Sequence, residues 1–409
     1  MLRLFRHGPL APLLECGFRP FFLLAAVTAV TAIGAWMAFW LLGARLPSTP
    51  GGPVVWHAHE MLFGFALAAV AGFTLTAIPE FTTTPDVSRE RTLALIALWI
   101  LGRVAFAGAG LPGLAILAML ADVGLLALLL ALLAPRLLAD AGRRHLSFAW
   151  VLLGMIVATL GFHVDAMRGA WPMRWLFVMV GLLMCLIVIA LSRISMRVVN
   201  QSLDELGDAA TEYRARPPRR HLAVACILLH TLAEFMAPGH PASGWIALAC
   251  AAAVLNLTND WHVGRALLRR WPLMLYLVYW FMALGYAVIG AGVLAGQPWT
   301  SAGRHLLMIG AMGLAIFAVL NIAGRIHAGV EPDERGWVPA AVGLIACAAG
   351  ARAAMGLGGL DPAVAIGVSG GCWVLAFGMH LAHHWRVLTG PRTDGGRGCA
   401  GLADRTPVR

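Results

Sequence analysis

The sequence contains no lysine, and charged residues make up only 12% of its 409 positions, about half the share of ordinary soluble domains. Hydrophobic residues make up 60%, which is more than a water-exposed fold of this length can bury. These two features exclude a soluble globular protein. The net charge of +10 would suggest nucleic-acid binding in a soluble domain. Here the arginines lie between apolar runs, so we expect no nucleic-acid partner.

Several chemical motifs are also absent. The chain has no Walker A loop, dinucleotide fingerprint or nucleophile elbow, which argues against an ATP-driven pump. It has no C-x-x-C-H sequence, so any haem would be bound non-covalently, as haem b. The cysteines form no C-x-x-C pair and mostly lie in apolar runs, which predicts hydrophobic filler without a disulfide framework or zinc ribbon. They are Cys16, Cys185, Cys226, Cys250, Cys347, Cys372 and Cys399.

Apolar runs of about 20 residues recur along the whole chain, and each is long enough to cross a hydrocarbon core as a helix. They predict an all-α, polytopic membrane protein with about 12 transmembrane helices. The first run is too long for a signal-peptide core, so we interpret it as a span. The predicted spans are 20–42, 57–79, 92–110, 112–134, 146–163, 174–192, 221–237, 242–259, 272–294, 304–324, 337–355 and 363–385.

The arginines predict how these helices are oriented. If both termini are cytoplasmic, the N-terminal segment, the even-numbered loops and the tail contain 24 of the 30 arginines, as the positive-inside rule requires. We therefore expect one multi-pass transmembrane domain over residues 1–409. Its two six-helix halves, 1–193 and 220–390, are joined by a cytoplasmic loop over 194–219, and residues 391–409 form a cytoplasmic tail.

The chain has 14 histidines, a high number for a sequence so poor in other polar residues. The predicted topology places four of them, on spans two, five and ten, at one membrane depth near the outer face. Imidazoles from separate helices at one level are typical ligands of haem, and copper also takes imidazole. Histidines at helix ends can equally be interfacial residues with their polar tips in water. The candidate cofactor and metal ligands are His57, His59, His163 and His305.

Two acidic residues accompany these histidines. Glu60 lies three residues after His57, on the same face of a regular helix, and is a candidate proton relay or partner that orients a ligating imidazole. Asp122 lies within span four and is a candidate cavity residue, although the sequence does not locate its partner. No other catalytic residue follows from the sequence.

Histidines elsewhere carry weaker predictions. His230 and Glu234 are four residues apart within a span, which predicts either a proton path or a hydrogen-bonded pair that joins helices. His380, His383 and His384 border the predicted tail, and we expect them to face water and lipid headgroups.

Two N-terminal motifs are distinctive. The first is Gly17-Phe18-Arg19-Pro20-Phe21-Phe22-Leu23-Leu24, and the second is Trp56-His57-Ala58-His59-Glu60-Met61-Leu62-Phe63-Gly64-Phe65. Shorter pieces follow in order, including Arg304-His305 and Pro391-Arg392-Thr393-Asp394-Gly395. Together they resemble the NnrS family over nearly the whole chain. The chain departs from the family pattern after span six, where Leu191-Ser192-Arg193 stands, and in span nine, which has no histidine.

The resemblance implies a bacterial inner-membrane protein that is associated with haem, copper, denitrification and resistance to nitric oxide (nitrosative stress). Together with the predicted topology, it implies that the protein binds or processes nitric oxide at a histidine-ligated metal centre near the periplasmic face, within the lipid bilayer. Net reduction of nitric oxide would need an electron donor, which the sequence does not name. An oxidoreductase activity is compatible with this resemblance, but no reaction follows from it.

Two other functions stay open at this stage. The same histidines would serve as transient ligands in a transporter or permease for a metal, haem or small anion. A scaffolding role would need none of them, and substitution of His57 and His305 by alanine would then leave the phenotype intact.

Overall fold

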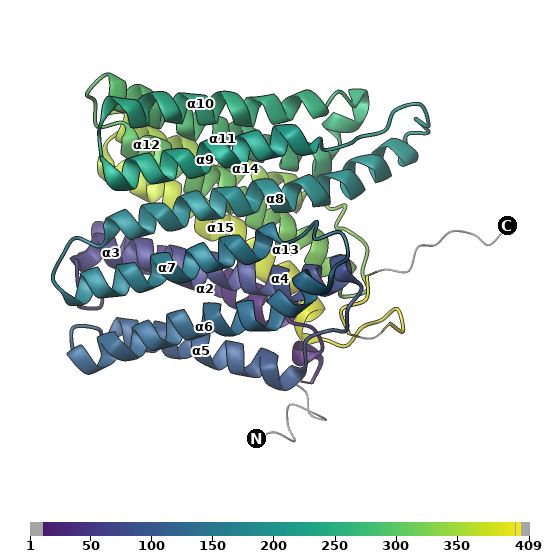
Figure 1. The fold of residues 1–409 in the computed structure, drawn as a ribbon, viewed down its shortest axis with the longest axis horizontal. Helices are drawn as coiled ribbons and strands as arrows, with labels where there is room; N and C mark the ends of the chain where they lie inside the picture. Colours follow the sequence, from purple (N-terminus) through teal and green to yellow (C-terminus); the bar gives the residue numbers. More distant parts are fainter. Residues whose placement is uncertain (1–10, 397, 402–409) are drawn as a thin grey trace.

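The computed structural model describes residues 11–396 and 398–401, and this part of the chain consists of helices joined by turns and loops. The helices lie side by side in one bundle (Figure 1). Ten helical segments of the described chain are long and apolar enough to cross a membrane. These observations confirm the predicted all-α, polytopic membrane fold.

Twelve long helical segments of the described chain correspond to the 12 predicted spans. Two of them, α5 and α9, begin with clustered charges and are less apolar than the others, but they pack against α6 and α10 within the bundle. The segments are α2 (Phe18–Leu42), α3 (Gly52–His59) with η2 (Glu60–Ala66) and α4 (Leu67–Thr82), α5 (Arg89–Ala107), α6 (Pro112–Ala139), α7 (Ser147–Met167), α8 (Met173–Glu205), α9 (Pro217–Met236), α10 (Pro241–Leu257), α11 (Arg270–Leu294), α12 (Thr300–His305) with η5 (Leu306–Gly313) and α13 (Leu314–Ile326), α14 (Trp337–Gly356) and α15 (Pro362–Thr389).

The order of the helices in space follows the chain closely. The helices α5, α6 and α7 lie along one side of the bundle, α9, α10 and α11 lie along the other, and α8 runs between them (Figure 1). The last helix, α15, packs against both α14 and α2, so the end of the chain returns to its beginning. The most deeply buried spans are 52–82, 173–205 and 300–326. The first of these carries His57 and His59, and the third carries His305.

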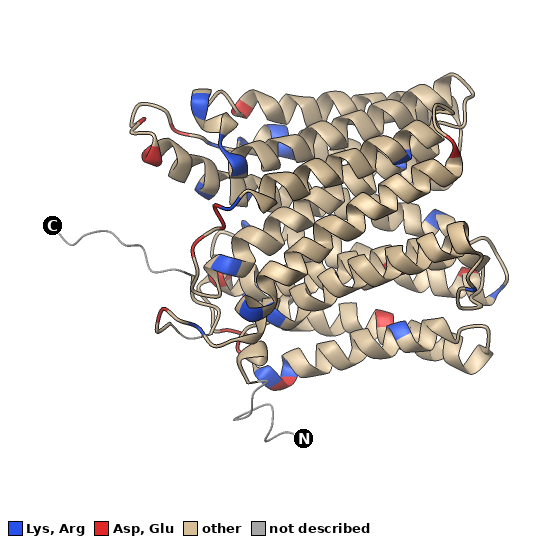
Figure 2. Ribbon diagram, turned by 180° about the vertical axis from the view of Figure 1, so that it is seen from behind, with Lys and Arg blue, Asp and Glu red and all other residues tan. Residues whose placement is uncertain are grey.

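Charged side chains gather at the end of the bundle where the two ends of the described chain lie (Figure 2). We call this the arginine-rich end, and we define it by Arg193, Arg197, Arg269 and Arg270, which line one cavity there. The positive-inside rule predicts that this end faces the cytoplasm.

Two spans contain a π-helical segment, at Glu60–Ala66 and at Leu306–Gly313. A π turn adds a residue to the helical repeat and changes the direction of the side chains around it, and such turns are frequent at functional sites. Each segment begins directly after a candidate histidine, His59 or His305. The regular helical face that the sequence suggested for His57 and Glu60 therefore does not continue through this region.

The expectation that every cysteine is hydrophobic filler is wrong for two of them. Cys16 and Cys399 form a disulfide, with Cα atoms 5.1 Å apart across 383 residues of sequence. This bond ties the start of α2 to the C-terminal tail. Such a pair leaves no signal in local spacing, because only the return of α15 to α2 brings the two cysteines together. The other five cysteines are free.

The prediction for the histidines near the tail is wrong for His380 and His384. Both are completely buried, whereas His383 is half-buried and stacks on Trp337 at 4.6 Å between ring centroids. The reason is that α15 continues to Thr389, so His384 lies more than one turn and His380 more than two turns inside the helix end. Side chains of α13 and α14 then cover them, with Phe317 against His380 and Trp337 against His384.

Candidate metal centre

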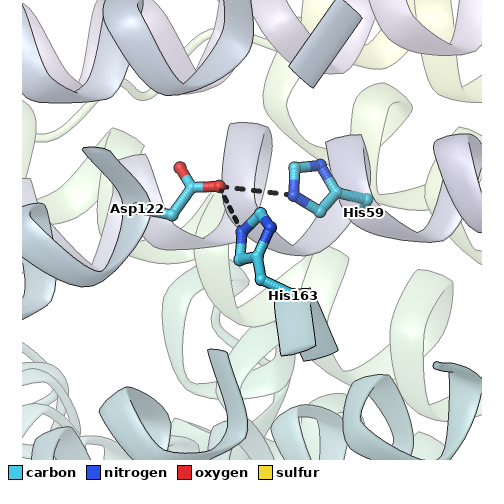
Figure 3. A group of neighbouring side chains, drawn as sticks. All are labelled: His59, Asp122 and His163. Atoms are coloured by element: carbon cyan, nitrogen blue, oxygen red, sulfur yellow. Dashed lines mark hydrogen bonds and ion pairs between the residues drawn. The ribbon is translucent and has the colours of Figure 1, made fainter. Parts of the chain in front are cut away.

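A cluster of two imidazoles and a carboxylate lies inside the bundle (Figure 3). His163 lies about one turn before the last residue of α7, so the cluster is nearer to the end opposite the arginine-rich end. His59 ends α3, Asp122 comes from α6 and His163 from α7. Asp122 Oδ2 lies 3.3 Å from His59 Nε2 and 3.2 Å from His163 Nε2. One donor atom from each residue lies within 4.8 Å of the others, and all three side chains are buried. Three convergent nitrogen and oxygen donors are the chemistry of a transition-metal site.

Charged neighbours complete this cluster. Arg103 Nη2 donates to Asp122 Oδ1 at 2.6 Å, and its Nη1 lies 3.5 Å from Glu60 Oε1. Glu60 Oε1 also lies 3.0 Å from His59 Nδ1. Two carboxylates thus face one guanidinium, so the group carries a formal charge of −1 when the imidazoles are neutral. Buried charge of this kind is stabilised by a cation, because water is not there to solvate it.

Small residues on neighbouring helices make room for the cluster. A Cβ added at Gly102 of α5 would collide with Asp122 Oδ1. Within the π segment, the carbonyl of Gly64 accepts a hydrogen bond from Trp99 Nε1 at 3.1 Å. A Cβ at Gly64 would also approach Glu60 Oε2 to 3.3 Å. Gly102 therefore lets α5 approach Asp122 of α6, and Gly64 lets η2 approach Trp99 and Arg103 of α5.

Phenylalanine rings enclose the His59 imidazole. Its ring stacks on Phe106 at 3.4 Å between centroids, and Phe63 and Phe162 lie at 4.6 and 5.1 Å. Such a cage excludes water and strengthens electrostatic interactions within it. It also fixes the plane of the imidazole, because the ring cannot rotate without displacing a phenylalanine.

The structure separates the four candidate histidines into two groups. His59 and His163 belong to the cluster, with ring centroids 5.8 Å apart, whereas His57 and His305 lie outside it. His57 stacks on Trp36 at 4.3 Å, and His305 Nδ1 lies 2.7 Å from the Ser301 carbonyl.

Arg352 of α14 is close enough to interact electrostatically with both His57 and His305. Its positive charge disfavours a cation between these two imidazoles. The pair is therefore better suited to a neutral or anionic ligand than to a bare metal ion.

The sequence predicted that Glu234 of α9 pairs with His230, but in the structure its main partner is an arginine. Glu234 forms an ion pair with Arg304 of α12, and His230 packs against Tyr286 at 5.4 Å between ring centroids. The ion pair joins two helices, as expected for a buried polar contact between spans.

Sequence reasoning did not include Asp122 among the ligands. It marked this residue as costly within a span but found no partner for it. Arg103 on the preceding span was the available signal, because a buried acid and a buried base on adjacent helices are expected to pair.

A large cavity opens at the arginine-rich end, between the two halves of the chain. It has a volume of about 1370 Å³ and is lined by aromatic rings, including Phe22 and Phe73, and by the arginines that define this end. His327 also lines it, with Nδ1 2.7 Å from the Cys399 carbonyl and Nε2 3.5 Å from Glu80 Oε2. The cavity is large enough for a flat organic molecule, and its lining carries charges of both signs, because five acidic residues lie there as well: Glu80, Asp204, Glu205, Glu331 and Glu334.

Comparison with known proteins agrees with the motifs. A search of curated proteins finds no match to this chain. The family model described as "NnrS protein" matches residues 12–392, which include the cluster, the two π segments and α15. This family is related to nitric oxide, and the match covers nearly the whole chain. The protein therefore belongs to the NnrS family of membrane proteins.

Proposed function

We propose that this protein binds nitric oxide at a metal ion held by His59, His163 and Asp122. The observation that supports the proposal best is the convergence of two imidazoles and one carboxylate, all buried, from three separate helices. Family membership supplies the link to nitric oxide, and the cluster supplies a place for the metal.

The donor set suits copper. Two imidazole nitrogens and one carboxylate oxygen bind copper well, and three protein ligands leave a coordination position for a small molecule. When bound, the ion would supply the site at which nitric oxide is held. The phenylalanine rings around His59 would keep bulk water away from that site, which suits a small, weakly polar molecule.

Glu60 and Arg103 are positioning residues in this proposal. Glu60 accepts a hydrogen bond from His59 Nδ1, which leaves Nε2 free as the ligand atom and fixes the orientation of the ring. Arg103 holds Asp122 through its Oδ1 atom, so that Oδ2 points to the two imidazoles. Glu60 is also the nearest carboxylate that could pass a proton to the cluster.

Haem does not fit beside His59, because the cage of phenylalanines leaves no space for a porphyrin plane. The large cavity supports a placement of haem b there, with His327 as the iron ligand. A hydrogen bond from Nδ1 to the Cys399 carbonyl orients His327, and its Nε2 would exchange the 3.5 Å contact with Glu80 for the iron, while the arginines of the lining would pair with the propionate groups. In this arrangement the haem and the copper ion would lie towards opposite ends of the bundle. In this proposal His57 and His305 are not ligands of the copper ion. Beside Arg352 they would bind a neutral or anionic ligand instead.

The cellular setting is part of the same proposal. We place the protein in the bacterial inner membrane, with the arginine-rich end in the cytoplasm and the cluster towards the periplasm. Net reduction of nitric oxide would need an electron donor, and a role in denitrification or nitrosative-stress defence would follow from the chemistry at the metal.

The decisive measurement is the copper content and optical spectrum of the purified protein beside three single variants. We expect His59→Ala, His163→Ala and Asp122→Asn to lose copper, and the control His262→Ala, an exposed histidine, to retain it. The wild type should also change its spectrum on addition of nitric oxide. Wild-type copper content in all three variants would refute the proposed ligands.

A permease is the second candidate, and the large cavity favours it because a transporter needs a chamber open at one end. Mild chelation separates the two functions. A permease should release its metal to the chelator within minutes and move it across proteoliposome membranes, whereas a resident cofactor should stay with the protein.

A further inference from the structure

A second cavity opens at the arginine-rich end, between α8, the start of α9 and the loops that precede α7 and α9. It has a volume of about 1140 Å³ and shares Arg193 with the first cavity. Six arginines but only two acidic residues line it, so its lining has a net positive charge. Such a cavity attracts anions.

The two acidic residues of this lining already have partners. Glu212 accepts a hydrogen bond from Arg214 at 2.7 Å. Asp260 forms ion pairs with Arg216 and Arg219, and it also accepts a hydrogen bond from the backbone N–H of Arg216 at 3.0 Å. These carboxylates are therefore engaged at one side of the cavity and do not neutralise the rest of it.

The other four arginines of the lining have no ion pair with a carboxylate of the described residues. Three of them come from different elements: Arg144 precedes α7, Arg193 belongs to α8 and Arg220 to α9. Arg193 is close enough to each of the other two to be repelled by it. Asp140 is the acidic residue that acts on Arg193, and its carboxylate accepts a hydrogen bond from the backbone N–H of Arg144. One negative charge thus faces three positive ones.

The positive-inside rule explains why arginines occur at this end, but it does not explain why they converge. Arg193 and Arg220 are half-buried, and they lie on helices that pack against each other. Like charges that meet where water is partly excluded repel more strongly than they do in water. The buried imidazole of His145 is close enough to interact with the same three arginines, and its Nδ1 has no partner among the described residues. An anion with several oxygen atoms would satisfy all of these groups.

We propose that Arg144, Arg193 and Arg220 bind a phosphate-bearing anion with at least two negative charges. Each guanidinium can donate two parallel hydrogen bonds to one phosphate group. The hydroxyl groups of Ser147 and Ser192 also line the cavity and can donate to phosphate oxygens.

Two sources could supply this chemistry. One is a soluble diphosphate compound, and the other is the headgroup of a lipid with two phosphates, such as cardiolipin, which basic pockets between spans are known to bind. The site is separate from the His59–Asp122–His163 cluster and does not depend on the proposed function, because none of its residues belongs to that cluster.

The experiment offers both sources to the full-length protein, purified in detergent and freed of lipid. Inorganic pyrophosphate is titrated by calorimetry in magnesium-free buffer, and cardiolipin is titrated by native mass spectrometry. We expect one equivalent of at least one probe to bind and to raise the melting temperature of the wild type. Arg193→Gln and Arg220→Gln should each weaken that binding by about tenfold or more, because each removes a charged hydrogen-bond donor.

The pattern of binding identifies the source. Binding of pyrophosphate alone assigns the site to a soluble compound, binding of cardiolipin alone assigns it to the lipid, and mutual displacement shows that the phosphate groups themselves are recognised. Arg168→Gln is the matched control, since it removes the same charge from an exposed position at the end of α7, far from this cavity, and should bind as the wild type does. Absence of saturable binding of both probes would overturn the proposal, and so would wild-type affinity in the Arg193→Gln and Arg220→Gln proteins.

Discussion

The two buried histidine clusters of this protein differ in how their polar atoms are satisfied. Around His59, Asp122 and His163, the donor atoms lie within reach of one another, and Arg103 and Glu60 extend the network. Around His380 and His384, the rings stack and both Nε2 atoms are unpaired. In the first cluster, Asp122 contacts Arg103 and His163, and Glu60 contacts His59 Nδ1, whereas His59 Nε2 faces Asp122 at 3.3 Å without a well-formed hydrogen bond. In the second, His380 Nδ1 approaches Asn321 Oδ1 only to 3.5 Å, which is at the limit of a hydrogen bond.

This difference determines what mutations should do. Removal of one member from a connected network leaves a buried charge behind, which is strongly destabilising. Removal of an imidazole whose nitrogen has no partner eliminates a penalty. The comparison therefore predicts opposite signs for stability at the two clusters, and the following tests run from the largest expected effect to the smallest.

Asp122→Ala should have the largest effect. It leaves Arg103 buried without its closest partner, and we expect a loss of about 3–5 kcal/mol in the free energy of unfolding, measured by denaturant titration in detergent. The double variant Arg103→Met/Asp122→Leu should recover most of that loss, because both charges are gone. Equal stability of the single and double variants would show that the pair is not coupled as the distances suggest.

Gly102→Ala tests the close approach of α5 to the cluster. The added methyl group collides with Asp122 Oδ1, so we expect a loss of about 1–3 kcal/mol in unfolding free energy together with weaker copper binding. Gly113→Ala in α6 is the control, since no atom lies within 4 Å of its Cβ position. A Gly102→Ala protein as stable as this control, with normal copper content, would mean that the helices can separate freely here.

Glu60→Gln should leave the fold intact and weaken copper binding. The amide keeps the size of the side chain but loses the charge that orients His59, and we expect a loss of about 10–100-fold in copper affinity by competitive titration. Glu205→Gln, at an exposed position at the end of α8, should leave affinity unchanged. If both variants bind copper equally well, Glu60 does not position the ligand.

The smallest effect should come from His384→Phe. Unlike the variants above, it should stabilise the protein. Phenylalanine keeps the stack with His380 and removes a buried nitrogen that lacks a partner, so we expect a gain of about 1 kcal/mol in unfolding free energy. His59→Phe, by contrast, should destabilise the protein because it breaks contacts to Glu60 and Asp122. A loss at His384 as large as that at His59 would remove the distinction between the two clusters.

The sequence predicted which kinds of residue form the candidate site and at which depth in the membrane they lie, but not which of them meet. His59 and His163 were predicted as ligands, and Asp122 was recognised as an unusual residue in a span. Their grouping, and the separation of His57 and His305 from them, depends on the π turn after His59 and on which helices adjoin. Neither follows from helical periodicity, because the extra residue of a π turn changes the face on which later residues lie.

The sequence by itself determined the fold class, the number of helical segments and the family, because a helix must satisfy its own backbone in lipid and apolar runs of the required length mark it. The tertiary structure alone decided which polar residues meet. It joined Cys16 to Cys399, paired Asp122 with Arg103, and buried His380 and His384 against helices that precede them by more than 20 residues. Side-chain contacts between spans depend on the rotation and neighbours of each helix, and these are set by packing of the whole bundle, which no local stretch of sequence encodes.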